Sequence, residues 1–206
     1  MKKNYILSFV LFLILILNAS AFNDVDNHLN KEAIDYLKNK NIVQGYGDGS
    51  YGPDFKINRA EFSKIVLESL NIELSYTSCF PDVQSGWYPP YVCKAKELGI
   101  INGYQDGYFR PFNDINLVES LKIILEAYES ELNYDYEKWY EPYYYFMEEN
   151  QLLDNVSSNM FDQISRGEMA QIIFNLDTFY NRLTNTDSEG QVESENQPEE
   201  DEGAYV

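Results

Sequence analysis

The chain has 206 residues, and its 34 Asp and Glu residues outnumber its 15 Lys and Arg residues to give a formal net charge of −19. A surface this acidic repels nucleic acid and anionic lipid at long range, which argues against both as partners. One His and two Cys residues also argue against a zinc site, so no metal ligand set is predicted.

First in chain order is a secretory signal pattern over residues 1–21. Two lysines precede an apolar run over 5–17, and the small residues 19–21 form a cleavage site that predicts Phe22 as the first residue of the exported chain. An uncleaved anchor is the alternative, but the run is shorter than the roughly 20 residues that span a bilayer. We therefore expect an exported protein without a membrane span, whose net charge is −21 once the two lysines are removed.

Internal repetition decides the expected architecture. A shift of 58 residues aligns two stretches without a gap, including matched Gly and Pro positions. A third copy is more worn and its middle loop is three residues shorter, but it keeps Trp139-Tyr140 where the second copy has Trp87-Tyr88. The predicted repeats cover residues 22–71, 79–128 and 131–178.

Each repeat has the pattern of a helix, a long turn and a second helix. In repeat one the first helix is expected over 30–39, and a Gly-rich turn follows it. The second helix begins at a capping box, in which one side chain accepts from an early backbone N–H and a Glu reaches back. These boxes are Asn58 and Glu61, Asn116 and Glu119, and Ser165 and Glu168. Two helices cannot bury their apolar faces alone, so we predict a mainly α fold of three helix-turn-helix repeats packed around a common axis.

The order of these motifs resembles the S-layer homology (SLH) family over essentially the whole exported domain. The family pattern opens with F-x-D-V and a Trp or Leu before the first helix. It continues with G-I-I-x-G-Y-x-D-G-x-F-x-P and ends with I-T-R-A-E-F. Repeat one carries most of it from Phe22 to Phe62, and repeat two carries it from Phe80 to Ile115.

The resemblance implies a pseudo-threefold helical spindle in a cell-surface protein associated with the cell wall. It also implies non-covalent anchoring, through secondary cell wall polysaccharide with an acidic or pyruvylated sugar held in grooves between repeats. Some family members bind a peptidoglycan-associated polymer instead.

The Arg of the family's T-R-A-E motif corresponds to Arg59 and Arg166, whereas repeat two has Leu117 there. A helix N-terminus favours an anion, and an Arg beside it can grip a carboxylate with two hydrogen bonds. We therefore predict at most two anion sites. The alternative is that both arginines pair with neighbouring carboxylates and lock the repeats together.

Five further residues are candidates for lining a ligand groove. Arg110 lies in the turn near the second helix of repeat two. Asp48 and Asp106 lie in the Gly-rich turns, where Asp is also a good turn former. Trp87 and Trp139 precede the first helices of repeats two and three, and each would either stack on a sugar face or pack into the core.

The recurring Glu61, Glu119 and Glu168 also invite a catalytic interpretation, because glycoside hydrolysis needs only two carboxyl groups. Capping explains all three glutamates. No catalytic residue and no enzyme activity are therefore predicted.

Cys79 and Cys93 flank the opening of repeat two and are the only cysteines. In an exported chain a disulfide is the leading interpretation. Unpaired thiols and links to other chains are the alternatives.

Residues 181–206 are rich in acids and poor in large apolar side chains, which predicts a disordered acidic tail. The tail would act as a spacer, or as a dock for a surface protein or Ca²⁺. An alternative function follows from the same acidity: a surface assembly protein, crosslinked through Ca²⁺, without specific glycan binding. Apart from this weakly indicated calcium, no cofactor is expected.

Overall fold

The computed structural model describes residues 22–75, 78–132 and 135–194, with side chains as far as residue 185. The predicted signal segment and residues 195–206 lie outside this part of the chain. Within it lie six helices: α2 (Lys31–Asn39), α3 (Arg59–Ser69), α4 (Pro89–Glu97), α5 (Leu117–Ala127), α6 (Glu141–Glu149) and α7 (Arg166–Ser194).

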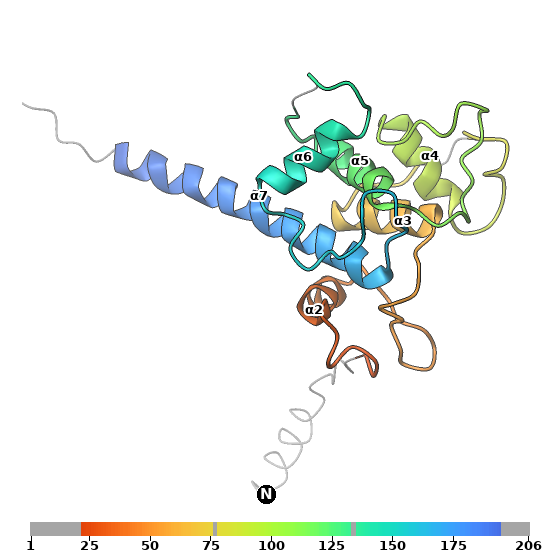
Figure 1. Ribbon diagram of the computed structural model, residues 1–206, viewed down its shortest axis with the longest axis horizontal. Coiled ribbons are helices and arrows are strands. Elements are labelled where there is room, and N and C mark those ends of the chain that lie inside the picture. Colours follow the sequence, from red (N-terminus) through yellow and green to blue (C-terminus); the bar gives the residue numbers. More distant parts are fainter. Residues whose placement is uncertain (1–21, 76–77, 133–134, 195–206) are drawn as a thin grey trace, which may run out of the picture.

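The six helices pack as three pairs arranged in a closed ring (Figure 1). The second helix of each repeat contacts the first helix of the next, so that α3 packs on α4 and α5 packs on α6. The last helix, α7, returns to α2, and it also touches α3. This arrangement confirms the mainly α fold with helix pairs around a common axis.

Backbone hydrogen bonds define that axis. Ile57, Ile115 and Ile164 hold equivalent positions just before the second helices, and all three are fully buried. The N–H of Ile115 donates to the carbonyl of Ile57 (3.0 Å), that of Ile164 to Ile115 (3.1 Å), and that of Ile57 to Ile164 (3.3 Å). Because the three bonds form a closed ring, the repeats are related by a pseudo-threefold axis.

Each of the first five helices ends in the same way. The residue two positions after the last helical residue has a left-handed backbone, with φ between 51° and 79°, at Asn41, Asn71, Gly99, Glu129 and Gln151. The next N–H then reaches back into the helix, as from Ile42 to the carbonyl of Leu37 at 2.9 Å. The chain leaves every helix in one defined direction, which fixes where the following loop begins.

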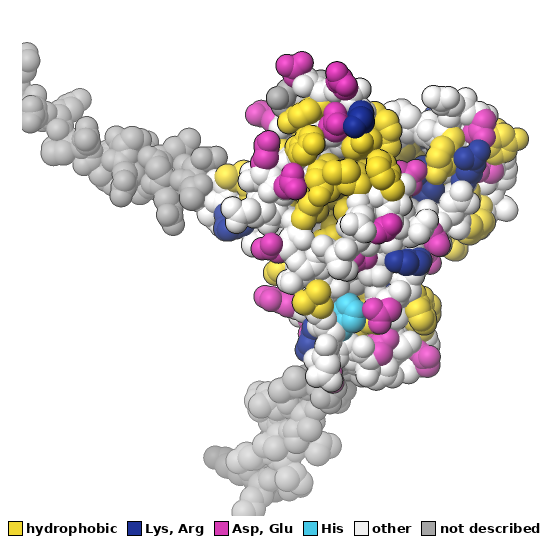
Figure 2. Space-filling view, viewed as in Figure 1, with side chains coloured by type: hydrophobic (Ala, Val, Ile, Leu, Met, Phe, Trp, Pro, Cys, Tyr) yellow, Lys and Arg dark blue, Asp and Glu magenta, His cyan; other side chains and the backbone are white. Residues whose placement is uncertain are grey.

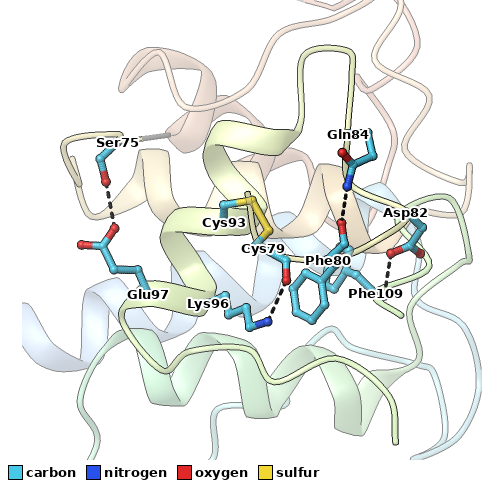
Figure 3. Close-up of a disulfide and its surroundings, with 9 residues drawn as sticks. All are labelled: Ser75, Cys79, Phe80, Asp82, Gln84, Cys93, Lys96, Glu97 and Phe109. Atoms are coloured by element: carbon cyan, nitrogen blue, oxygen red, sulfur yellow. Dashed lines mark hydrogen bonds between the residues drawn. A yellow bond between two sulfur atoms is a disulfide. The ribbon is translucent and has the colours of Figure 1, made fainter. Parts of the chain in front are cut away.

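The predicted disulfide joins Cys79 to Cys93, with 5.3 Å between their Cα atoms (Figure 3). It ties the segment that enters repeat two to α4. From α4, Lys96 donates to the carbonyl of Cys79 at 2.8 Å, and its ammonium lies 4.0 Å from the ring centre of Phe80. The disulfide prediction is confirmed, and the bond supports the helix that leads into the loop of repeat two.

The structure differs from the expected tail in its first part, because α7 continues to Ser194. The helix is anchored at Tyr180, whose ring stacks on Tyr128 at 5.4 Å and whose hydroxyl donates to Ser130 at 2.6 Å. A nucleated helix gains one hydrogen bond per added residue, so it can extend beyond its last packed turn without burying apolar surface. None of the helices in the described residues is long and apolar enough to cross a membrane.

Candidate ligand-binding grooves

A groove of about 760 Å³ lies beside the loop of repeat two, and we call it groove 1. All three repeats contribute to it, because α3 of repeat one and the segment before α6 of repeat three border the loop and α5 of repeat two. The lining side chains that matter for ligand chemistry are Arg59, Tyr104, Arg110, Glu119, Lys122 and Trp139.

Arg59 crosses from the start of α3 into the loop of repeat two. Its side chain is only 7% exposed, and its Nε donates to the carbonyl of Phe109 at 3.0 Å. The guanidinium lies 4.7 Å from the ring centre of Tyr104 and 4.8 Å from that of Phe109, and its Nη1 is 3.6 Å from Glu119. Because a guanidinium carries five N–H donors, Arg59 can join two repeats and still offer donors to the groove that it lines.

Arg166 repeats this arrangement beside the loop of repeat one, in a smaller groove of about 250 Å³ that we call groove 2. Its Nε donates to the carbonyl of Tyr51 at 2.9 Å, and its Nη2 to that of Gln44 at 3.3 Å. The guanidinium lies 4.6 Å from the ring centre of Tyr51. Burial raises the pKa of the Tyr51 hydroxyl, which donates to the carbonyl of Arg166 at 3.1 Å.

Both arginines therefore join two repeats, as in the locking alternative, while also lining grooves. Arg59 does so partly through the carboxylate of Glu119, whereas Arg166 does so through backbone carbonyls. The helix starts themselves differ from the expected open anion sites, because their N–H groups already have partners. Arg59 N donates to the carbonyl of Asn113 at 2.9 Å, and Arg166 N donates to that of Phe55 at 2.8 Å. These first N–H groups are therefore not free to form open anion sites at the two helix starts.

The capping boxes occur at all three second helices. Glu61 N donates to Asn58 and Glu119 N donates to Asn116, both at 2.9 Å, while Glu168 N donates to Ser165 at 3.1 Å. Each Glu also accepts from the backbone N–H of its own N-cap residue, at 2.8–3.4 Å.

Glu168 is more deeply placed than a cap requires. Its carboxylate also accepts from the backbone N–H groups and hydroxyls of Ser157 and Ser158, at 2.8–3.1 Å. Burial raises the pKa of Glu168, but the hydrogen bonds from Ser165, Ser158 and Ser157 together lower it by more. The pKa therefore lies below its ordinary value. The group is a buried acceptor that holds the loop of repeat three.

Trp87 and Trp139 occupy matching positions at the groove edges, Trp87 in groove 2 and Trp139 in groove 1. They are 47% and 54% exposed, which excludes the core alternative for both. Arg110 and Asp106 line groove 1 and form an ion pair with 2.5 Å between Nη2 and Oδ2. Asp48 instead accepts from the N–H and hydroxyl of Ser50, at 3.0 and 2.6 Å, and these bonds lower its pKa.

The sequence analysis missed two lysines and two aspartates. Lys64 lines groove 2 and Lys122 lines groove 1, each three residues after a capping Glu. Asp24 accepts from two successive N–H groups of the repeat-one loop at 2.8 Å, and Asp82 does the same in repeat two at 3.0 and 2.6 Å. The alignment of the repeats could have found all four. The two lysines occupy equivalent positions in repeats one and two, and so do the two aspartates.

Each groove lies at a junction between repeats, and the third such junction is beside the loop of repeat three. There the residues equivalent to the Arg, Lys and Trp of the grooves are Leu117, Gln171 and Leu29. Leu117 is 1% exposed, and its N–H donates to the carbonyl of Asp162 at 3.0 Å, as Arg59 donates in groove 1. The backbone arrangement is therefore kept while all three groove side chains are replaced.

Buried polar contacts also join the repeats at this third junction. Gln171 is buried and accepts from Asn30 Nδ2 at 3.1 Å, and the same nitrogen donates to the carbonyl of Asn155 at 2.9 Å. A hollow of about 320 Å³ lies beside Leu117, with Glu148 and Asp154 as its charged lining residues, and a larger one of about 590 Å³ lies beside Leu29. Lys56 lines the larger hollow together with the acids Asp54, Asp162 and Glu168. Acids outnumber lysines and arginines in both linings, which disfavours an anion there.

Within the described residues, no group of three or more His, Cys, Asp or Glu side chains converges to hold a metal ion. Calcium was expected either at the acidic tail or between the acidic faces of assembled copies, and both stay predictions.

Comparison with known proteins distinguishes repeats one and two from repeat three. The profile of the S-layer homology domain matches residues 21–63 and 80–117, which carry the loops and arginine position of repeats one and two. Repeats one and two of the chain therefore carry S-layer homology (SLH) domain sequence. Repeat three lies outside the matched residues, in keeping with its shorter loop.

Longer proteins share this SLH region. The chain is 38% identical over 116 residues to exoglucanase XynX of Acetivibrio thermocellus, covering 55% of this chain and 10% of that protein. It is 35% identical over 115 residues to a cellulosome-anchoring protein of the same organism, covering 52% and 26%. A surface layer protein of Brevibacillus choshinensis is 28% identical over 103 residues, covering 47% and 9%.

The chain thus spans about a quarter or less of these relatives' lengths. The shared part is the SLH region, a non-catalytic anchoring module, and not the enzyme part of XynX. The SLH region is thus shared with a surface layer protein and a cellulosome-anchoring protein, in keeping with the predicted cell-surface localisation.

Proposed function

We propose that this SLH domain anchors the protein by binding an acidic cell wall polysaccharide in grooves 1 and 2. One observation carries the proposal: a buried Arg, a Lys and an exposed Trp occur together in both grooves, and all three are replaced together at the third junction. A role limited to joining the repeats would require only the Arg, since the Lys and Trp side chains lie at the groove surface.

The charge distribution supports an anionic ligand. Five of the chain's 15 basic residues line the two grooves, although the protein as a whole has a net charge of −19. They are Arg59, Arg110 and Lys122 in groove 1 and Lys64 and Arg166 in groove 2. The overall charge weakens attraction at long range, so recognition depends on short-range contacts with these cations.

Each groove side chain suits a different part of an acidic sugar. A guanidinium can donate two parallel hydrogen bonds to a carboxylate or phosphate. An exposed indole offers an apolar face for the C–H side of a sugar ring. Figure 2 shows hydrophobic side chains gathered over α5 and α6, the helices that flank Trp139.

The decisive experiment is sedimentation of the exported chain with purified cell walls of its own species, before and after extraction of wall polysaccharide. Two variants convert one groove each to the residues of the third junction: Lys122→Gln/Trp139→Leu in groove 1, and Lys64→Gln/Trp87→Leu in groove 2. Both keep the buried arginines, so folding should be preserved. Each should weaken retention by roughly tenfold, as expected for losing one charged and one stacking contact.

The matched control is Lys31→Gln/Leu29→Ala, which removes one lysine and one large apolar side chain at the start of repeat one. It should sediment like the unmodified chain. Unchanged binding after polysaccharide extraction would refute the proposal, as would equal losses in the control and groove variants. Repeating the assay with a calcium chelator tests the assembly alternative, which requires calcium and is insensitive to the groove substitutions.

A further inference from the structure

Grooves 1 and 2 share a plan but differ in one side chain that the SLH motif comparison does not explain. Arg110 stands in the loop of repeat two where the loop of repeat one has Gly52. The backbone is left-handed at both, with φ of 57° at Arg110 and 68° at Gly52. Glycine adopts this conformation freely, whereas a residue with a Cβ adopts it at an energetic cost.

The setting of Arg110 is unusual among the described residues with left-handed backbone. Four of the other five non-glycine examples are the helix-ending residues Asn41, Asn71, Glu129 and Gln151, where this conformation completes the helix end. Arg110 instead lies in the loop, and strained backbone of this kind tends to occur at functional sites.

The Arg110 side chain is oriented into groove 1. Its guanidinium lies 4.3 Å from the ring centre of Tyr104, and Arg59 lies 4.7 Å from the same centre. The two guanidinium carbons are therefore at most about 9 Å apart. Tyr104 is held in place by its hydroxyl, which donates to Glu119 at 3.2 Å. One aromatic ring thus positions two cations.

Asp106 does not remove Arg110 from ligand chemistry. The two side chains are 44% and 47% exposed, and an ion pair this exposed to water contributes little stability. Asp106 accepts from Nη2 alone in that pair, at 2.5 Å, while a guanidinium has five N–H donors. The pair therefore orients Arg110 and leaves donors for a second acceptor.

We infer that groove 1 selects glycan segments with two anionic groups on one sugar or on adjoining sugars, with Arg59 holding one group and Arg110 the other. Groove 2, with Gly52 and about a third of the volume, accepts a single anionic group. This inference rests on the proposed function and adds the ligand class of one groove. Arg110 is the specificity-determining residue.

The test uses oligosaccharides cut from the organism's own wall polysaccharide and separated by anion exchange into singly and doubly charged fragments. Binding is measured by titration calorimetry in a Trp87→Leu background, which weakens groove 2. The parent should bind doubly charged fragments roughly fivefold more tightly than singly charged ones, because one partly exposed charged contact contributes about that much. Arg110→Gly, which copies repeat one, and Arg110→Gln should both lose this preference, and Arg182→Gln, an equal charge change on α7, should keep it.

Three results would overturn the inference. The parent could show no preference between the fragment classes, which leaves the proposed function intact. The Arg110 variants could lose affinity equally for both classes, which would show that Arg110 only supports the loop. Binding of neither class would remove the proposed function together with the inference. Thermal unfolding of Arg110→Gly serves as the folding control, because glycine suits the left-handed backbone there.

Discussion

Groove 1 and the third junction are built on the same backbone and differ in what fills it. At each, the first residue of a second helix donates its N–H to the loop of the next repeat: Arg59 to Asn113 and Leu117 to Asp162. Groove 1 then presents cations and Trp139, while the third junction has apolar side chains, a buried Gln171 and two nearby acids.

The difference separates the residues that make the fold from those that we propose to bind a ligand. Every repeat contributes one isoleucine to the central hydrogen-bonded ring and has one capping box. These shared features account for the spindle. The Arg, Lys and Trp set varies between junctions without altering that framework, so it is free to serve binding. The predictions below test this separation, starting with the largest expected change in stability.

Loss of the disulfide should produce the largest effect. Replacing Cys79 and Cys93 by Ser removes a link across 14 positions of sequence, which costs about 3 kcal/mol of unfolding free energy in the chain-entropy account. Urea unfolding of the double variant and the parent measures this. Because the link supports α4 and not the groove side chains, wall binding of the folded variant should be unchanged. Weakened binding by fully folded protein would show that the link also shapes groove 1.

Glu168 and Glu61 form the next comparison. A capping box accepts Gln in place of Glu, so Glu61→Gln should cost less than about 0.5 kcal/mol. Glu168→Gln also places an NH₂ group against the N–H donors of Ser157 and Ser158, which should cost about 2 kcal/mol. Equal losses in denaturant unfolding would mean that Glu168 acts only as a cap and that the loop of repeat three is held in another way.

The pH dependence of stability gives a third test of the same group. The folded-state pKa of Glu168 lies below its ordinary value of 4.5. The unfolded chain therefore takes up a proton first as the pH falls, and the stability that Glu168 provides is complete above the unfolded pKa and lost through the folded pKa. Melting temperatures from pH 6 to pH 3 should fall more for the parent than for Glu168→Gln. Parallel curves would contradict the assignment.

Repetition in the sequence was enough to predict the fold, because matched Gly, Pro and capping residues reported the turns and helix starts directly. It also identified Arg59, Arg166 and the loss at Leu117. It gave contacts between repeats only as an alternative, through carboxylates, whereas the arginines mainly donate to backbone carbonyls of the neighbouring repeat. Packing between repeats decides where such a long side chain lies. Comparison of Lys64, Lys122 and Gln171 in the alignment would have found the remaining groove residues.

The tail shows a different limit of sequence reasoning. Composition argues against a packed core over 181–194, and the structure shows a helix there as a continuation of α7. Low apolar content predicts the lack of a core, but it does not decide the backbone conformation of a segment attached to an already formed helix.

The smallest expected change in stability is also the sharpest test of the grooves. Lys64→Gln and Lys122→Gln copy Gln171 at the two groove positions. Lys64 pairs with Glu68 at 2.8 Å and Lys122 lies 5.8 Å from the ring centre of Trp139, contacts near the surface that contribute about 0.5 kcal/mol or less. Melting temperatures should hardly change, yet retention on walls should weaken by roughly threefold for each lysine, with a smaller difference at high salt because exposed charges are screened. A large loss of stability would make these lysines part of the framework. Unchanged retention would leave the arginines as the only cations that matter, and the joint replacement of all three residues at the third junction would need another cause.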